Sequence, residues 1–349
     1  MKYLNMVVIA AVLLVVMPIW AAEKIEVKDP AKLIPSIQIG DKLTLKLWGF
    51  AQAAYVESAV PDEFQWTNLR LLGNLDGQRI GLGFVFNFAD LQHPNGNYVR
   101  EFYGKIKLTD SLEARAGWLL TSVGNGEAFP GPPKIETVLF PRSLAYGQYG
   151  TGLQLRWNKE LWSVVADVTG DTSLPFSDSG RFKNLEFSAR LKRSFRGQDR
   201  EVGYLGTSFQ YTQTVNRFGF DGQWQPIKEL TLRGGMFYSD YESQRKSNRF
   251  GGFLLAAYRP LSWFELHTMV DQTSDLSKEY EEIQKQKDKQ GNITYKKVTI
   301  QTSDLTNVYW TNGIRFLGKN DRWSATLDYE MNLEDTKSGW LRGRLQVRF

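Results

Sequence analysis

The sequence of 349 residues contains no cysteine and only two histidines, His93 and His267. Without cysteine there is no disulfide framework and no thiolate to act as a metal ligand or nucleophile, which argues against a small disulfide-stabilised secreted domain. A serine hydrolase would depend on one of the two histidines, and no recognisable nucleophile motif accompanies either. The composition therefore predicts a protein that is not an enzyme and has neither a cofactor nor a metal site.

Long apolar runs are also scarce, and the longest lies near the N-terminus at residues 6–17. A lysine precedes it, and small residues followed by a charged pair come after it, which is the layout of a secretory signal peptide. We predict a signal peptide at residues 1–21 and a periplasmic N-terminal segment at residues 22–41. No later stretch approaches the roughly 20 apolar residues of a membrane-spanning helix, which argues against a helical membrane protein.

The charge balance is only mildly basic, since 43 Lys and Arg residues face 38 Asp and Glu residues for a formal net charge of +5. The sequence has no basic tail or cluster of the kind that binds nucleic acid. Nucleic acid is therefore not an expected partner.

The sequence is rich in alternating apolar and polar residues. In residues 341–349, apolar or small residues occupy the odd positions, and arginine or glutamine occupies the even ones. Residues 80–88, 112–118, 185–192 and 323–330 alternate in the same way. Successive side chains of a strand point to opposite faces, so each of these strands has one apolar and one polar face. About sixteen candidate strands follow this pattern, each near the ten residues of a tilted membrane strand.

The connections between these segments alternate in length. Short turns on one rim and long loops on the other are typical of outer-membrane barrels, whose apolar faces meet lipid and whose polar faces line a wet lumen. We therefore predict an all-β fold, a transmembrane antiparallel β-barrel of about 16 strands over residues 42–349, in the outer membrane of a Gram-negative cell. Its short periplasmic turns are predicted at residues 74–77, 109–111, 158–160, 225–228, 259–261 and 318–321, and its long external loops include residues 121–148, 170–184 and 272–304.

Aromatic residues gather beside the predicted short turns. Tryptophan prefers the membrane interface, where its ring is half buried and its polar atom stays wet. Any one of these residues could instead cap the core of a soluble β-sandwich, but their shared position favours a membrane girdle. The predicted girdle consists of Trp157, Trp162, Trp224, Trp263, Trp323 and Phe349.

If the polar faces line the lumen, the wall carries charges of both signs with an excess of positive charge. Such an excess raises the local concentration of anions and predicts a weak anion preference. The alternative is that many of these charges pair with one another and only hydrate the interior. The predicted lining cations are Lys46, Arg70, Lys105, Lys107, Arg115, Arg156, Arg190, Lys192, Arg233, Arg315, Arg342 and Arg344.

The long connection at residues 121–148 contains four prolines and several apolar residues. A loop of this length is usually functional or disordered, and its apolar residues need a surface to pack on. In a barrel the nearest such surface is the inner wall. We predict that this loop folds inward and constricts the pore, with Lys134, Glu136 and Arg142 near the opening; a loop over the rim or at a subunit contact is the alternative.

Several segments occur in a familiar order. The order begins with Leu43–Gln52 and Phe84–Asp90. A predicted strand pair then leads through Gly117 into the Pro-rich loop, which ends with Phe140-Pro141-Arg142 and Gly150–Leu153. This order resembles the phosphate-selective porin O/P family. The resemblance implies a trimeric diffusion pore of about sixteen strands, with its third external loop inside the lumen. The chain lacks the dense ladder of arginine and lysine on one stretch of wall that phosphate-selective members have.

The sequence thus predicts a porin, a water-filled passive diffusion channel for small hydrophilic or anionic solutes, in contact with outer-membrane lipid and assembled as a homotrimer. The competing class is a non-transporting barrel, such as an adhesin, an assembly scaffold, or a sheath for a periplasmic partner such as a cytochrome.

Overall fold

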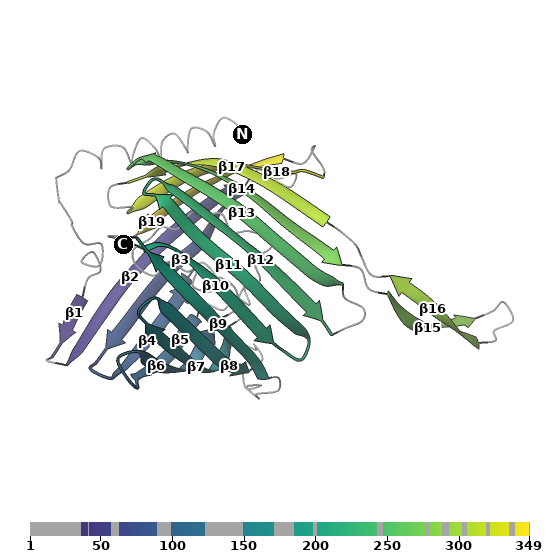
Figure 1. Ribbon diagram of the computed structural model, residues 1–349, viewed down its shortest axis with the longest axis horizontal. Helices are drawn as coiled ribbons and strands as arrows, with labels where there is room; N and C mark the ends of the chain where they lie inside the picture. Colours follow the sequence, from purple (N-terminus) through teal and green to yellow (C-terminus); the bar gives the residue numbers. More distant parts are fainter. Residues whose placement is uncertain are drawn as a thin grey trace. The chain divides into compact units, whose positions relative to one another are not determined.

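Strands make up nearly all of the chain that the computed structural model describes (Figure 1). The described residues are 36–40, 42–56, 63–88, 99–122, 149–170, 185–197, 201–242, 247–276, 279–287, 293–301, 306–318, 322–334 and 339–348. The predicted signal peptide, most of the predicted N-terminal segment, and residues 123–148 of the predicted constriction loop lie outside them. Within these ranges, no helix is long and apolar enough to cross a membrane.

A closed ring of 16 antiparallel strands dominates the structure, which confirms the predicted fold class. Each strand pairs with the next one in the ring, and the last strand pairs with the first. In ring order the strands are β2 (Leu43–Val56), β3 (Glu63–Asp76), β4 (Ile80–Asn87), β5 (Val99–Lys107), β6 (Leu112–Leu120), β7 (Tyr149–Lys159), β8 (Trp162–Gly170), β9 (Leu185–Arg196), β10 (Glu201–Tyr211), β11 (Val215–Ile227), β12 (Leu230–Tyr241), β13 (Asn248–Leu261), β14 (Phe264–Leu276), β17 (Thr306–Leu317), β18 (Trp323–Asn332) and β19 (Gly339–Arg348).

The two faces of the ring have opposite chemistry. On one face large apolar side chains are exposed, such as Leu254 at 73% and Leu153 at 64%. On the other face charged side chains are buried, such as Arg190 at 3% and Asp328 at 1% exposure. This is the reverse of a soluble protein, where charged residues are seldom fully buried. Exposed apolar and enclosed polar faces on a closed ring are the arrangement of a transmembrane β-barrel.

A short strand, β1 (Ser36–Ile39), completes the wall where the ring closes. The last strand, β19, pairs with β2 only over Phe50–Val56, and β1 pairs with β2 over Leu43–Lys46. The hydroxyl of Thr44 also donates to Gln38 Oε1 at 2.9 Å. Because an unpaired strand edge is costly in hydrocarbon, β1 covers backbone groups that β19 leaves free. This strand lies inside the segment predicted to be periplasmic, and the sequence pattern did not indicate it.

Several strands run further into the short turns than the sequence predicts. The turns predicted around Pro226 and Pro260 lie instead inside the ends of β11 and β13. In both places the pairing register shifts, between Trp224 and Ile227 and between Tyr258 and Leu261. Proline is tolerated at such irregular strand ends because it needs no ladder hydrogen bond there. Proline therefore marks a bulge before each turn, not the turn itself.

The long connection predicted at residues 272–304 contains a hairpin of its own. Strand β14 continues to Leu276, and β15 (Glu279–Lys287) then pairs with β16 (Ile293–Gln301) as a separate two-stranded sheet. The segment is rich in Ile, Val, Thr and Tyr as well as charged residues. These β-branched and aromatic residues explain why a polar, charged stretch still forms strands.

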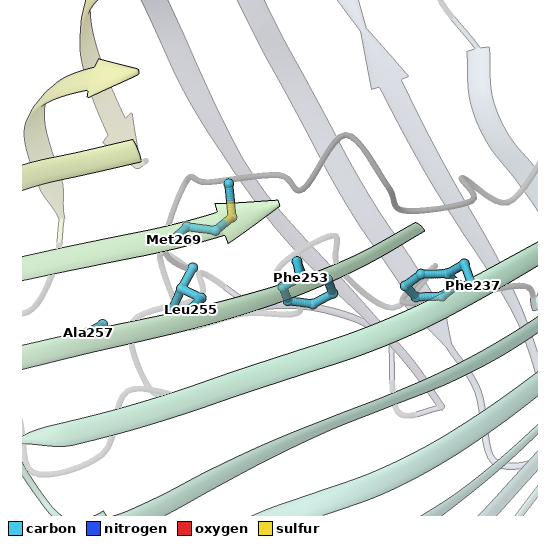
Figure 2. Packing of buried hydrophobic residues seen from close by; sticks show 5 residues of the cluster. All are labelled: Phe237, Phe253, Leu255, Ala257 and Met269. Carbon is cyan, nitrogen blue, oxygen red and sulfur yellow. The ribbon is translucent and has the colours of Figure 1, made fainter. Parts of the chain in front are cut away.

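Part of the inward face is apolar. Phe237 on β12, Phe253, Leu255 and Ala257 on β13, and Met269 on β14 form a buried cluster. Figure 2 shows their side chains on neighbouring strands, along one face of the sheet. The rings of Phe237 and Phe253 lie close to Gly235, where a Cβ would be 2.8 Å from Phe253. The glycine thus leaves room for both rings beside the strand.

A charge in the middle of the outward face should destabilise the barrel. The change Leu153→Arg, near the middle of β7, is expected to lower the free energy of unfolding by about 2–4 kcal/mol because a guanidinium would enter hydrocarbon. Urea titration of vesicle-inserted protein, followed by tryptophan fluorescence, measures the effect, with Leu153→Met as the control. An unchanged midpoint for the arginine variant would show that this face does not meet lipid.

Candidate functional site

The cations predicted to line the lumen all occupy the inward face of the ring. Lys105 lies opposite Arg115, which lies opposite Gln154, a residue with only 2% exposure. Directly paired residues share a face of a sheet, so the register carries this assignment from strand to strand. The inward cations are Lys46, Arg70, Lys105, Lys107, Arg115, Arg156, Arg190, Lys192, Arg233, Arg315, Arg342 and Arg344.

Several of these cations form ion pairs with acids on the same face. Arg190 donates two hydrogen bonds to Asp221, at 2.7 and 2.9 Å, and both side chains are almost completely buried. Taking two charges out of water costs several kcal/mol per ion, and close pairing with hydrogen bonds offsets that cost. Further pairs are Lys105–Asp76 at 2.6 Å, Arg115–Glu113 at 2.7 Å, Arg315–Glu265 at 2.6 Å, Arg342–Glu330 at 3.6 Å, and Arg344–Asp328.

A glycine on an intervening strand makes room for some of these contacts. His267 on β14 and Asp328 on β18 both lie opposite Gly313 on β17, and His267 Nε2 is 2.7 Å from Asp328 Oδ1. A Cβ at position 313 would lie 2.2 Å from the aspartate oxygen and 2.3 Å from the imidazole nitrogen. Only glycine leaves this space open. The same arrangement places Gly206 beside the Arg190–Asp221 pair and Gly81 between Lys105 and Asp76.

The contact between His267 and Asp328 belongs to a buried polar network. Asp328 also accepts a hydrogen bond from Arg344, and Glu265 accepts one from Arg315 at 2.6 Å. The second oxygen of Glu265 is 3.9 Å from His267 Nδ1, too far for a hydrogen bond. Sequence reasoning did not find this network, because it depends on the register of β14, β17 and β18. Among the residues that the structure describes, no group of three or more His, Asp or Glu residues is placed to hold a metal ion.

The chain that leaves β6 turns onto the inward face of two strands that are not its neighbours. The Ser122 N–H donates to Asp167 Oδ2 on β8 at 2.9 Å, and the hydroxyls of Ser122 and Ser188, on β9, are 3.2 Å apart. The Ser188 hydroxyl also donates to Asp167 Oδ1. Strand β7 lies between β6 and β8 in the ring. Ser122 therefore lies inside the ring, against the wall.

Three inward cations carry charge that no acid compensates within the described ranges. Lys46 and Lys107 are exposed and form no ion pair with another described residue. Arg217 donates instead to the neutral amide oxygen of Gln210, at 2.6 Å. Sequence reasoning did not select Arg217, because the alternation around it is blurred by glycine. Lys46 and Lys107 lie at the strand ends on the rim that carries the predicted periplasmic turns. Arg217 lies near the start of β11, on the other rim.

The described girdle tryptophans lie beside the short turns and face outward. Trp162 and Trp224 are 39% and 57% exposed, and Trp157 and Trp323 share the face of apolar Leu112 and Val347. Trp263 stacks on Phe316, with 6.3 Å between ring centroids and 8° between ring planes. Outside the described residues lie Phe349 and the predicted constriction residues Lys134, Glu136 and Arg142.

Comparison with solved structures identifies the barrel as one with the fold of Gram-negative outer-membrane porins. OmpT of Vibrio cholerae superposes with a TM-score of 0.60 at 12% identity, covering 90% of this chain and 100% of that one. OmpF of Salmonella typhi gives 0.58 at 11% identity, covering 90% and 100%. OprB of Pseudomonas putida gives 0.57 at 12% identity, covering 88% and 94%. At these identities the likeness concerns the fold.

No protein-family model matches the sequence, and no curated protein is similar to it. The resemblance to the phosphate-selective porin O/P family is therefore supported only at the level of a general porin-like β-barrel.

A methyl group at position 313 should disrupt the network around His267. We expect Gly313→Ala to lower the free energy of unfolding in lipid vesicles by about 1–3 kcal/mol, because the buried His267 and Asp328 would lose their contact. Gly104→Ala is the matched control, since the nearest heavy atom to a Cβ there is 4.0 Å away. Equal urea midpoints for the two variants would contradict the proposed role of the gap.

Proposed function

We propose that this chain is an outer-membrane porin, a non-enzymatic, water-filled channel for passive diffusion of small hydrophilic solutes. The observation that carries the proposal is the inverted wall, because a closed ring with charged side chains enclosed and apolar side chains exposed separates a wet lumen from lipid. The porin fold of the neighbouring structures supports it. A signal peptide at residues 1–21 would direct the chain out of the cytoplasm.

The loop at residues 121–148 is proposed to narrow the lumen. Support comes from Thr121 and Ser122, its first two residues, which are 1% and 8% exposed. The hydrogen bonds from Ser122 to Asp167 and Ser188 fix the start of the loop on the inner wall. From this anchor the loop is proposed to extend into the enclosed space before the chain reaches β7. Lys134, Glu136 and Arg142 are the residues proposed to approach the opening.

A weak preference for anions is the second part of the proposal. The ion pairs of the wall neutralise much of its charge, so selectivity depends on the cations that remain. Lys46, Lys107 and Arg217 are of this kind, and they lie toward the two ends of the channel. Excess positive charge at the mouths of a narrow passage raises the local anion concentration. Among the wall residues that the structure describes, no feature singles out phosphate among small anions.

We further propose that the channel assembles as a homotrimer in outer-membrane lipid. One structure of Vibrio cholerae OmpT is described as a trimer form, and its barrel superposes on this one with a TM-score of 0.53 at 10% identity. A closed ring has no free strand edges, so subunits can associate only through outward faces or loops.

Charge reversal at the lumen mouth should change ion selectivity. In planar bilayers with a salt gradient, the unaltered channel is expected to give a reversal potential of anion-preferring sign. The double change Lys46→Glu and Lys107→Glu should move that potential toward cation preference, and Lys159→Glu, on an exposed residue beside a short turn, is the control. The absence of conducting steps would favour a plugged scaffold barrel. Cation preference of the unaltered channel would refute the selectivity proposal.

Loss of the Asp167 anchor should widen the channel. We expect Asp167→Ala to raise single-channel conductance and its fluctuations, because Ser122 would lose its charge-assisted hydrogen bond to the wall and keep only the weaker contact with Ser188. Glu186→Ala removes an inward negative charge from β9, where Glu186 accepts from Gln210 at 3.2 Å, and serves as the control for charge alone. Equal effects of the two changes would attribute the result to charge and would count against an anchored loop.

A further inference from the structure

The hairpin of β15 and β16 is a two-stranded sheet of its own, in the long connection between β14 and β17 (Figure 1). Among the strands that the structure describes, none covers the outer edge of either one. An isolated two-stranded hairpin is only marginally stable in water, and three or more strands are needed for independent stability. An open strand edge is also a template for pairing with another chain. The hairpin is therefore suited to gain a strand from a partner.

The charges of β15 are separated along the strand, with acids in its first half and lysines in its second. Glu279 and Glu281 lie four and two residues before Ile283, and Lys285 and Lys287 lie two and four residues after it. Because alternate residues of a strand share a face, all five positions belong to the same face of the hairpin. Ile283 is the central residue of this strand of nine residues. The signs of charge are therefore opposite at equal distances on either side of the middle.

A strand with this pattern is complementary to a second copy of itself. An antiparallel pairing of two copies about Ile283 places Glu279 of one copy opposite Lys287 of the other. The same register places Glu281 opposite Lys285, and the two-fold symmetry repeats both pairs on the other side of the centre. Opposite charges directly across an antiparallel pair are stabilising, and like charges are destabilising. The charge pattern thus favours β15 itself as the missing neighbour of β15.

Other symmetric arrangements fit less well. A shift of the register to either side leaves part of β15 unpaired, and a register centred on Glu282 brings that acid opposite its own copy. The central residue of β16 is Lys297, so pairing of two β16 edges would bring lysine opposite lysine. Only the register about Ile283 pairs all nine residues of β15 without placing like charges together.

We propose that the edge of β15 is a contact between two copies of this chain, which join their hairpins into a four-stranded sheet in the order β16-β15-β15-β16 outside the membrane. The hairpin follows β14 on the rim opposite the short turns, where the long external loops are predicted. A two-fold contact joins two copies and cannot close a three-fold ring, so it links barrels of separate assemblies. It requires neither conduction nor the trimer proposed above. Lysine stays at the outer β16 edges, where charge discourages further strand addition.

Cysteine cross-linking of the full chain in lipid vesicles tests the register, because the sequence contains no cysteine. Ile283→Cys places the new thiol opposite its own copy, and directly opposed residues of an antiparallel pair have Cα atoms about 4.5–5.5 Å apart, within disulfide range. We expect covalent dimers after mild oxidation, measured by denaturing gel electrophoresis without reductant. Thr299→Cys on β16 is the control, because three strand spacings, roughly 14 Å, would separate its two copies.

Charge exchange in the Ile283→Cys chain tests the complementarity. Changing Glu279 and Glu281 to Lys should reduce the dimer yield several-fold, because lysines would then lie opposite lysines. Adding Lys285→Glu and Lys287→Glu exchanges the two halves of the strand, leaves the net charge unchanged and should restore the dimers. The exchanged chain should not cross-link to a size-tagged unexchanged chain, since their like charges would coincide.

Dimer yields that ignore these exchanges, or that are equal for cysteine at 283 and at 299, would overturn the proposal and indicate non-specific collision. The absence of dimers at 283 in protein whose heat-modifiable gel mobility shows a folded barrel would overturn it as well. Single-channel conductance of the same variants is expected to stay unchanged. Dimers formed by barrels that do not conduct would support the contact and count against the channel proposal alone.

Discussion

Pairing between β19 and β2 is the constraint on which the rest of the structure depends. In hydrocarbon every backbone N–H and C=O group needs a partner within the protein, and only a sheet without edges meets that requirement. The pairing of Arg342–Arg348 with Phe50–Val56 closes the sheet, and β1 covers the part of β2 beyond the last strand. Once the ring is closed, each strand has one face toward lipid and one toward an enclosed space. The distribution of apolar and charged side chains follows from that division.

Closure also brings many charges together on one concave wall. The side chains of Arg190, Arg315 and Arg344 are only 3%, 5% and 8% exposed there, and each is held by an acid on the same face. These pairs hold the buried charges of the wall in place. Asp167 has a different partner, because it accepts from the backbone of Ser122. One wall therefore combines charges that stabilise the barrel with a carboxylate that positions the next segment of chain.

Alternation of single residues was enough to predict the barrel and a ring of about sixteen strands. A period of two is a local property, and Lys105 or Arg344 can be assigned to a face without knowing any partner strand. Contacts between strands are not local. The approach of His267 to Asp328 depends on the pairing register of β14 with β17 and also on that of β17 with β18. Strand β1 was missed because it is too short to show an alternating pattern of its own. Pro226 and Pro260 misled the turn prediction because proline fits a bulge as well as a turn.

The space at Gly313 makes positions 267, 313 and 328, which are distant in the sequence, depend on one another. A barrel of this kind that keeps the histidine at 267 and the aspartate at 328 must keep glycine at 313, because any larger residue occupies the space in which they meet. A descendant that loses the imidazole is released from this requirement and is free to acquire a side chain at 313. Sequence change at these positions should therefore be correlated across evolution, even though residue 313 contributes no side-chain chemistry of its own.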